Sequence, residues 1–364
     1  MQGLLIDLLQ AVFNGYTSND PLNALVVRSH LSWQQVNVLK TYRAYLLQID
    51  VSVSREKINN TLLKHTTLCH LLLKYFQNRF DPELKASALE RQNGILKKLK
   101  GDILDYLREV SDLTEDILLM RLFLIMENTL RTNFFVVKDD DYFISIKLDT
   151  QKIKLPGPVP YREIFVYDAE MEGTHIRFGP ISRGGLRWSD RRDDFRREIL
   201  DLVKTQQTKN VVIIPVGSKG GFVIKKGVSG HQLALESKLQ YQKFIKGLLD
   251  ITDNFNDKGR IIKARQVISY DEPDPYLVVA ADKGTASFSD YANEVSQAYQ
   301  FWLGDAFASG GTCGYSHKEV GITAKGAWEC VRLHFKELGQ DVQKDPITVL
   351  GIGDMAGDVF GNGM

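Results

Sequence analysis

Cysteine is scarce in this sequence, and the few cysteines present form no recognisable pattern. The 364 residues include three, Cys69, Cys313 and Cys330, which are odd in number and widely spaced. They can form neither a disulfide framework nor a CxxC zinc site, and because the seven histidines are scattered we expect no metal site. So few thiols are typical of a reducing compartment, and we therefore expect a cytoplasmic protein.

An excess of charge of one sign is also absent. The chain has 46 Lys and Arg residues against 45 Asp and Glu residues, so its net charge is near zero. Without a broad positive field, we expect neither nucleic acid nor an anionic membrane surface as a partner. The longest apolar runs, residues 122–126 and 211–216, are too short to cross a bilayer, and the N-terminus has no secretory leader pattern.

Hydrophobic spacing predicts three regions along the chain. Residues 1–131 carry apolar side chains at helical spacing and are expected to be all helical. Strands and helices then alternate, which predicts an α/β domain at 132–315 with a mixed, largely parallel sheet. Its expected strands are 142–148, 164–167, 175–178, 211–214, 222–224 and 277–280, and its expected helices are 193–204, 233–249 and 289–302.

A third unit is expected at 316–364. It consists of a helix at 321–338, a strand at 347–350 and a glycine motif in which Gly351, Gly353 and Ala356 fit GxGxxG/A. Such a turn lets a pyrophosphate approach the backbone at the start of a helix, so the pattern predicts the start of a Rossmann dinucleotide-binding domain, here truncated. A plain glycine-rich turn is the alternative, because the acidic residue that would hold the ribose is not reached before Met364.

Two kinds of charged residue are candidates for chemistry. Lys219 lies between glycines next to a predicted buried strand, and its small neighbours favour partial burial over the solvated surface position that most lysines have. A desolvated lysine near other cations can act as a base near neutral pH. Arg183 and Lys209 supply further positive charge for a ligand with two carboxylates, and Gln206 can share a helix face with Lys209.

The remaining charged positions are more ambiguous. Asp282 follows a predicted strand, where α/β proteins hold their ligands, although a loop or capping aspartate is the more ordinary interpretation of this residue taken alone. The arginines between 187 and 197 alternate with acidic residues and are predicted to form mostly surface ion pairs. These are Arg187, Arg191, Arg192, Arg196 and Arg197.

In combination these motifs resemble the glutamate dehydrogenases, and most closely the large NAD-dependent branch. The resemblance covers essentially the whole chain. It is carried by Leu31-Ser-Trp33, Arg79-Phe-Asp-Pro82, Arg183-Gly-Gly-Leu-Arg-Trp188, Lys209-Asn210, Pro215-Val-Gly-Ser-Lys-Gly-Gly221, Val279-Ala-Ala-Asp-Lys-Gly-Thr285, Asp305-Ala-Phe-Ala-Ser-Gly-Gly311 and the segment from Gly351 to Gly361.

The resemblance implies roles for individual residues. Lys219 matches the catalytic lysine, and Asp282 matches the aspartate that exchanges protons with the substrate. Lys209 and Gln206 match positions on the α-carboxylate side, while Arg183 stands where smaller relatives have a lysine for the side-chain carboxylate. Thr323 resembles a threonine near the nicotinamide. The segment from Pro215 to Lys219 is one residue shorter than in the small enzymes.

The expected activity is oxidative deamination of L-glutamate to 2-oxoglutarate and ammonia, with hydride transfer to NAD in a homo-oligomer. Two alternatives remain open at the level of sequence. One is an amino-acid dehydrogenase for another side chain, which the cluster of cations disfavours. The other is a truncated, catalytically inactive ligand-binding remnant, because the nucleotide-binding domain is expected to be incomplete.

Overall fold

The computed structural model describes residues 1–136, 141–153, 155, 157–209, 216–227, 229–281, 288–312, 317–351 and 358–363. The chain divides into two compact units, Met1–Ala308 and Ser309–Met364. The first unit contains both the helical N-terminal region and the sheet. The second unit is described separately below.

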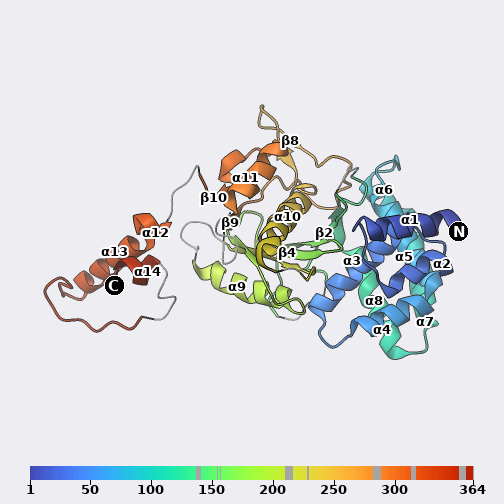
Figure 1. Ribbon diagram of the computed structural model, residues 1–364, viewed down its shortest axis with the longest axis horizontal. Helices are drawn as coiled ribbons and strands as arrows, with labels where there is room; N and C mark the ends of the chain where they lie inside the picture. The colour runs from blue at the N-terminus through green and yellow to red at the C-terminus, as the bar shows by residue number, and fades with distance from the viewer. Residues whose placement is uncertain are drawn as a thin grey trace. The chain divides into compact units, whose positions relative to one another are not determined.

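The N-terminal part of the first unit is all helical, as predicted (Figure 1). The start of α3 shows how local sequence sets a boundary. The Ser32 hydroxyl accepts from the Gln35 backbone N–H while the Gln35 side chain accepts from the Ser32 N–H, which satisfies two donors that a helix start would leave unpaired. The helices are α1 (Gln2–Phe13), α2 (Ala24–Arg28), α3 (Trp33–Ile49), α4 (Arg55–Lys64), α5 (Thr66–Phe80), α6 (Ala88–Asn93), α7 (Ile95–Arg108) and α8 (Leu113–Glu127), with a 3₁₀ turn η1 (Pro21–Asn23) before α2.

The helices lead into an eight-stranded sheet with the strand order β1-β2-β3-β4-β6-β5-β9-β10. Its strands are β1 (Thr129–Thr132), β2 (Ile144–Leu148), β3 (Arg162–Tyr167), β4 (Met171–Arg177), β5 (Gly185–Trp188), β6 (Ser218–Ile224), β9 (Val279–Ala281) and β10 (Ala308–Ser309). A separate short hairpin pairs β7 (Asn254–Phe255) with β8 (Ile261–Ile262).

The sheet is mixed, which confirms that part of the prediction. Neighbouring pairs from β1 through β4 to β6 are antiparallel, whereas β5 pairs in parallel with both β6 and β9. The connections explain the difference. The chain passes from β5 to β6 through α9 (Phe195–Lys209), and such a helical crossover is what parallel neighbours require. The short turn between β3 and β4 instead produces an antiparallel pair.

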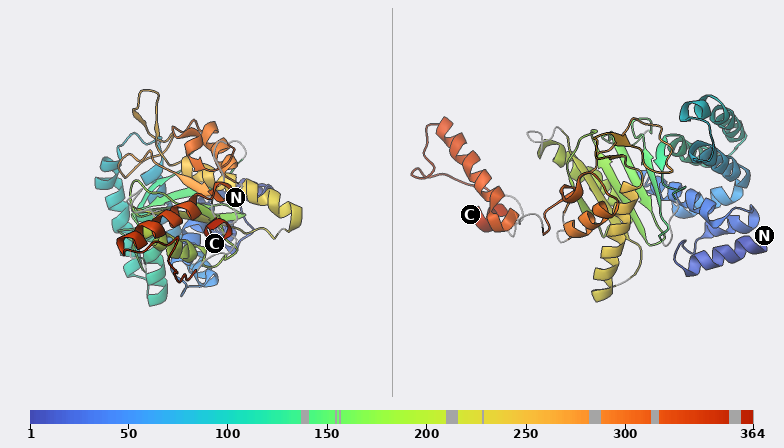
Figure 2. Two further views of the ribbon diagram at one scale, coloured as in Figure 1. Left: turned by 90° about the vertical axis from the view of Figure 1, so that its left-hand side faces the viewer. Right: turned by 90° about the horizontal axis from the view of Figure 1, so that it is seen from above.

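Helices cover both faces of the sheet (Figure 2). On one face lie α3 and α9, and on the other lie α10 (Gly230–Leu249) and α11 (Ser289–Ala298), which is followed by a 3₁₀ turn, η2 (Gly304–Ala306). Alternate residues of β3 pack on opposite faces of the sheet. Phe165 joins the core shared with the N-terminal helices, whereas Ile164 and Val166 pack toward α10. The helical region and the α/β region therefore share a core.

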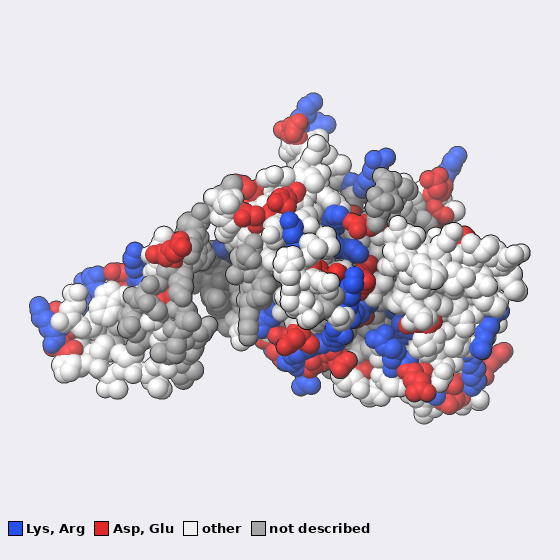
Figure 3. All heavy atoms as spheres, viewed as in Figure 1, with Lys and Arg blue, Asp and Glu red and all other residues white. Residues whose placement is uncertain are grey.

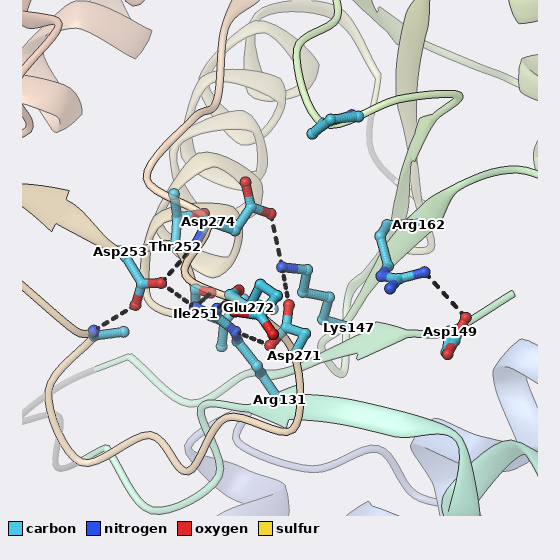
Figure 4. A network of polar contacts seen from close by, with 12 residues as sticks. Arg131, Lys147, Asp149, Arg162, Ile251, Thr252, Asp253, Asp271, Glu272 and Asp274 are labelled. Carbon is cyan, nitrogen blue, oxygen red and sulfur yellow. Dashed lines mark hydrogen bonds and ion pairs between the residues drawn. The ribbon is translucent and has the colours of Figure 1, made fainter. Parts of the chain in front are cut away.

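A buried polar network lies on the α10 face of the sheet (Figure 4). Arg131 of β1 contacts Asp253 at 2.9 Å and Asp271 at 2.6 Å. Lys147 of β2 contacts Asp271 at 2.5 Å and Asp274 at 2.7 Å, and Arg177 of β4 is paired with Asp274. Three strand cations thus hold three carboxylates from the connection between α10 and β9, which fixes that long connection against the sheet.

The second unit contains α12 (His317–Val320), α13 (Ile322–Glu337) and α14 (Asp358–Gly363). The strand predicted at 347–350 is wrong, because residues 346–350 have no regular structure and Val349 and Leu350 are exposed. A strand needs a neighbouring strand for its backbone hydrogen bonds, and the described part of this unit offers none. The predicted start of a Rossmann domain therefore stays a prediction.

Charges of both signs are present on the face of the protein that Figure 3 shows. Lys and Arg side chains alternate with Asp and Glu side chains over the face shown, as the near-zero net charge leads one to expect. In the part of the chain that the structure describes, no helix combines the length and the apolar character needed to cross a bilayer. Nor does any group of three or more His, Cys, Asp or Glu side chains there form a candidate metal site.

Candidate active site

Lys219 is the second residue of strand β6 and is 9% exposed. Although residues 217–221 are rich in glycine, the strand already begins at Ser218. Along a strand, alternate residues face opposite sides, so Lys219 shares a face with Gly221, which lies against Ile199 of α9. The predicted burial of the lysine is confirmed, and its amine is held on the α9 side of the sheet.

Gln206 of α9 packs directly onto the start of this strand. A β-carbon on Gly217 would lie 2.8 Å from the Gln206 carbonyl carbon and 2.9 Å from its Cγ, so the approach requires glycine. Helix α9 continues to Lys209, which confirms that Gln206 and Lys209 share one helix. The amide of Gln206 is therefore carried next to the segment that bears Lys219.

Arg183 also contacts the start of β6, through the backbone of Gly217. The two residues form an isolated parallel bridge, in which the Ser218 N–H donates to the Arg183 carbonyl oxygen at 3.0 Å. The following residue, Gly184, has no room for a side chain, because a β-carbon there would lie 1.4 Å from the Ser218 carbonyl oxygen. The structure thus brings the segments that carry Arg183, Gln206 and Lys219 together around residues 217–218.

Several buried polar atoms beside these residues have no hydrogen-bond partner among the residues that the structure describes. They are the hydroxyl oxygens of Ser182 and Ser218 and the Nδ1 atom of His175. His175 pairs across the sheet with Gly220, one residue after Lys219. Unsatisfied buried polar groups are uncommon in proteins and often mark places where water or a ligand binds. Sequence reasoning did not single out these three residues, since nothing in their local pattern distinguishes them from ordinary strand and loop residues.

His175 is held in its neutral form. Burial lowers its pKa to about 3, and the positive charge of Arg177 acts in the same direction, against a smaller opposing effect of Asp274. A neutral imidazole can donate through one ring nitrogen and accept through the other. Because His175 pairs with Gly220 and not with Lys219, its side chain lies on the opposite face of the sheet from the Lys219 amine. The neutral imidazole therefore belongs with Arg177 and the polar network of the α10 face.

The polar network on the α10 face reaches the site through residues 274–276. Arg177 contacts Asp274 and also donates to the Tyr276 carbonyl oxygen at 3.1 Å and to the Pro180 carbonyl oxygen at 3.3 Å. Burial raises the pKa of the Tyr276 hydroxyl, although the charge of nearby Arg183 opposes this. Arg177 thus ties the chain before Arg183 to the chain before β9.

The predicted arginine ion pairs turn out to be of two kinds. Arg191 pairs with Asp194 at the surface, as predicted. Arg196, however, is buried, and it donates to both carboxylate oxygens of Glu163 on β3, at 2.8 and 2.7 Å. The hydroxyls of Tyr45 and Thr174 donate to the same carboxylate at 3.0 and 2.6 Å. Arg196 therefore anchors the first turn of α9 to the sheet beneath it.

Some predicted site residues lie outside the described residues. These are Asp282, Gly353 and Ala356, together with the side chain of Lys209. What is described of their surroundings is that β9 ends at Ala281, which pairs with Leu186 of β5, and that Leu186 in turn pairs with Gly220 of β6. The strand before Asp282 is therefore separated from the strand of Lys219 by β5 alone.

Thr323 and Gly351 belong to the second unit. Thr323 is exposed in the first turn of α13, and its backbone N–H donates to the Asp358 carboxylate of α14 at 2.7 Å. Gly351 is exposed and adjoins Phe360 of α14. Within this unit, α14 thus connects the two predicted cofactor-binding positions.

Chemically, the site of the first unit combines the buried amine of Lys219 with the guanidinium and the amide carried by the adjacent segments of Arg183 and Gln206. The cations suit a ligand with carboxylates, and the amide can orient it. A buried amine among such groups is suited to proton transfer.

Comparison with known proteins agrees with this arrangement. Residues 102–364 match the family described as bacterial NAD-glutamate dehydrogenase, catalytic domain, and residues 17–82 match glutamate dehydrogenase, helical motif 3. The chain is 49% identical to an NAD-specific glutamate dehydrogenase of Pseudomonas aeruginosa over 99% of its length, and 47% identical to one of Halomonas elongata over all of it. An NAD-specific glutamate dehydrogenase of Mycobacterium tuberculosis is 46% identical over 98% of the chain.

In each case the chain spans 23% of the relative's own length. The family match nevertheless covers more than two thirds of the chain, and it includes the strands, the helix and the residues around Lys219. This chain therefore belongs to the family of bacterial NAD-glutamate dehydrogenase catalytic domains.

Proposed function

We propose that this chain supplies the substrate-binding and catalytic residues of an NAD-dependent glutamate dehydrogenase. The reaction converts L-glutamate, water and NAD⁺ into 2-oxoglutarate, ammonium, NADH and a proton. The observation that supports this most is the convergence of Arg183, Gln206 and the buried Lys219 around residues 217–218. The names of the three relatives give the same activity.

The two carboxylates of glutamate are bound by separate cations. Arg183 binds the side-chain carboxylate, and Lys209 with Gln206 binds the α-carboxylate side. Fixing both ends of the substrate leaves the α-carbon a single orientation, so that its hydrogen points toward the cofactor. A dehydrogenase for leucine or phenylalanine would not need the cation for the side chain, and a substrate panel of glutamate, leucine and phenylalanine separates these possibilities.

Lys219 acts as the base. Its amine takes a proton from the water that attacks the α-carbon after oxidation, and its burial beside Gly221 keeps bulk water from competing. Asp282 exchanges protons with the substrate's amino group.

NAD, when bound, accepts the hydride from the α-carbon. Thr323 and Gly351 fit such a role, because both are exposed and both adjoin α14. Thr323 would contact the nicotinamide part, and Gly351 with Gly353 and Ala356 would pass close to the pyrophosphate. The second unit would then be the first part of a dinucleotide-binding domain.

The test is Lys219→Ala in the full-length protein, with NADH formation from glutamate as the readout. We expect turnover to fall by about 100- to 10,000-fold with an unchanged circular dichroism spectrum. Lys226→Ala is the matched control, since Lys226 follows the same strand but forms ion pairs with Glu170 and Glu236 at the surface. Near-normal turnover of the Lys219 variant would sink the assignment.

The 364-residue chain by itself is expected to have negligible activity, because it spans 23% of the relatives' length. Detectable NADH formation by the isolated chain with glutamate would refute this. A homo-oligomeric state and a cytoplasmic location are part of the same proposal, and light scattering of the full-length protein tests the first of them.

A further inference from the structure

A cavity of about 550 Å³ lies in the first unit, away from the residues of the proposed active site. Its walls come from α5, α6, α7 and α8, from β1, from the residues that follow β2, and from Tyr270. This volume falls in the range of small-molecule sites, which is about 300–1,000 Å³. None of the residues around it belongs to the group formed by Arg183, Gln206 and Lys219.

Arg79 is the unusual residue of this cavity. Its side chain is 4% exposed, and its guanidinium lies 3.8 Å from the centre of the Tyr270 ring. Its Nε and Nη2 both donate to one acceptor, the Thr129 carbonyl oxygen, at 3.1 and 2.9 Å. Among the described residues, no carboxylate lies within ion-pair distance of it. A buried charge without a counter-charge is costly, which makes the position suited to an anion.

Other buried arginines of the chain have more compensating contacts than Arg79 has among the described residues. Arg43 is paired with Asp20, Arg131 with Asp253 and Arg196 with Glu163. Arg91 has no carboxylate either, but it donates to four different backbone carbonyl oxygens. Arg79 has one backbone carbonyl acceptor and a contact with the Tyr75 hydroxyl, and is therefore the least compensated of these buried guanidinium groups.

The rest of the cavity wall adds positive charge. Its cations are Arg79, Lys97, Lys100 and Lys152, and its carboxylates are Glu127 and Asp149. Both carboxylates are already engaged, Glu127 by Lys100 and Asp149 by Lys152 at 3.1 Å and Arg162 at 3.0 Å (Figure 4 shows the last pair). The wall is thus left with an excess of two positive charges.

A hydrogen-bond donor completes the set. Tyr75 lines the cavity, and burial raises the pKa of its hydroxyl to about 12, so the hydroxyl keeps its proton at any physiological pH. The leucines Leu96 and Leu124 supply an apolar part of the wall. The geometry points to a second ligand site, in which this cavity binds a small polyanion that carries carboxylate or phosphate groups, with Arg79 and Lys97 as its main cations.

Titration calorimetry of the purified chain at low ionic strength tests this, with citrate as the carboxylate probe and pyrophosphate as the phosphate probe. We expect saturable binding of one molecule per chain for at least one probe, and the tighter probe identifies the anion class. Lys97→Ala should weaken binding about three- to tenfold and Arg79→Gln by more than tenfold, since hydrogen bonds to charged groups are strong.

Two controls make the result specific. Lys98 is the next residue of α7 and is exposed but does not line the cavity, so Lys98→Ala should bind like the unaltered chain. Arg183→Ala should also bind the probe normally, because Arg183 does not line the cavity. Loss of binding in that variant would instead place the probe in the proposed active site. If Arg79→Gln does not fold, as circular dichroism shows, the surface double variant Lys97→Ala/Lys152→Ala replaces it.

The proposal is overturned if neither probe shows saturable binding. It is equally overturned if binding persists undiminished in the Arg79 and Lys97 variants, or if it disappears in Arg183→Ala.

Discussion

Gln206 and Gly217 are in direct contact, with α9 and the start of β6 so close that position 217 has no space for a side chain. This contact sets the distance between the helix that carries Gln206 and the strand that carries Lys219. The glycines at 217, 220 and 221 let protein segments approach each other closely. The first prediction concerns this contact.

Gly217→Ala is expected to push α9 away from β6. Overpacking of this kind costs about 1–3 kcal/mol of unfolding free energy, and the displaced Gln206 should also reduce glutamate turnover in the full-length protein. Urea unfolding and NADH formation measure the two effects. Gly227→Ala is the matched control, because Gly227 is exposed and has nothing within 4 Å of its β-carbon position. Equal behaviour of the two variants would contradict the contact's importance.

Glu163→Gln is expected to destabilise the first unit strongly. The substitution keeps the shape of the side chain but leaves the buried guanidinium of Arg196 without a counter-charge, which costs about 3–5 kcal/mol. Chemical denaturation followed by circular dichroism measures it. Asp105→Asn breaks an ion pair with Arg108 that is exposed at the surface and should change stability by less than about 0.5 kcal/mol. A small effect at Glu163 would show that the buried pair contributes little.

His175→Leu is expected to alter how stability depends on pH. Because burial lowers the pKa of His175 from 6.5 to about 3, the unfolded chain binds a proton between these values while the folded chain does not. The neutral, buried state of His175 therefore contributes to the unfolding free energy of the unaltered chain. This contribution is present in full above pH 6.5 and is lost as the pH falls toward 3.

At pH 4 the loss at His175 amounts to about 3 kcal/mol, since one pKa unit corresponds to about 1.4 kcal/mol. The variant should lack this part of the acid dependence, which urea melts at a series of pH values would reveal. His70→Leu, at an exposed position of α5, should keep the slope of the unaltered chain. Parallel pH profiles for His175→Leu and the unaltered chain would argue against a buried neutral imidazole.

The described cysteines should react very differently with iodoacetamide. Burial raises the pKa of the Cys69 thiol to about 12, whereas Cys330 is exposed on α13. Only the thiolate reacts, so peptide mass spectrometry at pH 8 should find Cys330 alkylated and Cys69 protected until denaturant is added. Alkylation of both at similar rates in the folded chain would place Cys69 near the surface instead.

The sequence was most informative where a pattern is local. Helical spacing in the first 131 residues and alternation at residues 144–148 follow from contacts within a few positions, and the structure has helices and a strand there. The cluster of Arg183, Gln206 and Lys219 was also predicted, because glycines and cations in a fixed order matched a known family and because α9 and β6 are close in sequence.

Features that depend on distant partners could not be predicted. Arg196 looked like one more surface arginine because Glu163, its partner, lies on a strand 33 residues earlier. The insertion of β5 between β6 and β9 leaves no trace in the spacing of apolar residues. The prediction of a strand at 347–350 was wrong for a related reason. A pattern of apolar residues indicates a tendency to form a strand, but it does not show whether a neighbouring strand is present to pair with it.

The polar network on the α10 face has a consequence for the order of folding. Asp271 contacts both Arg131 and Lys147, and Asp274 contacts both Lys147 and Arg177. Asp271 thus requires the neighbouring strands β1 and β2 to be paired already, and Asp274 requires β2 and β4 to be in place on either side of β3. Asp271 is 140 residues from Arg131 in sequence. Because such distant closures are slow to form, the connection between α10 and β9 is expected to dock late in refolding. The segment that carries Tyr276 toward the site would then be the last part of the first unit to acquire its native position.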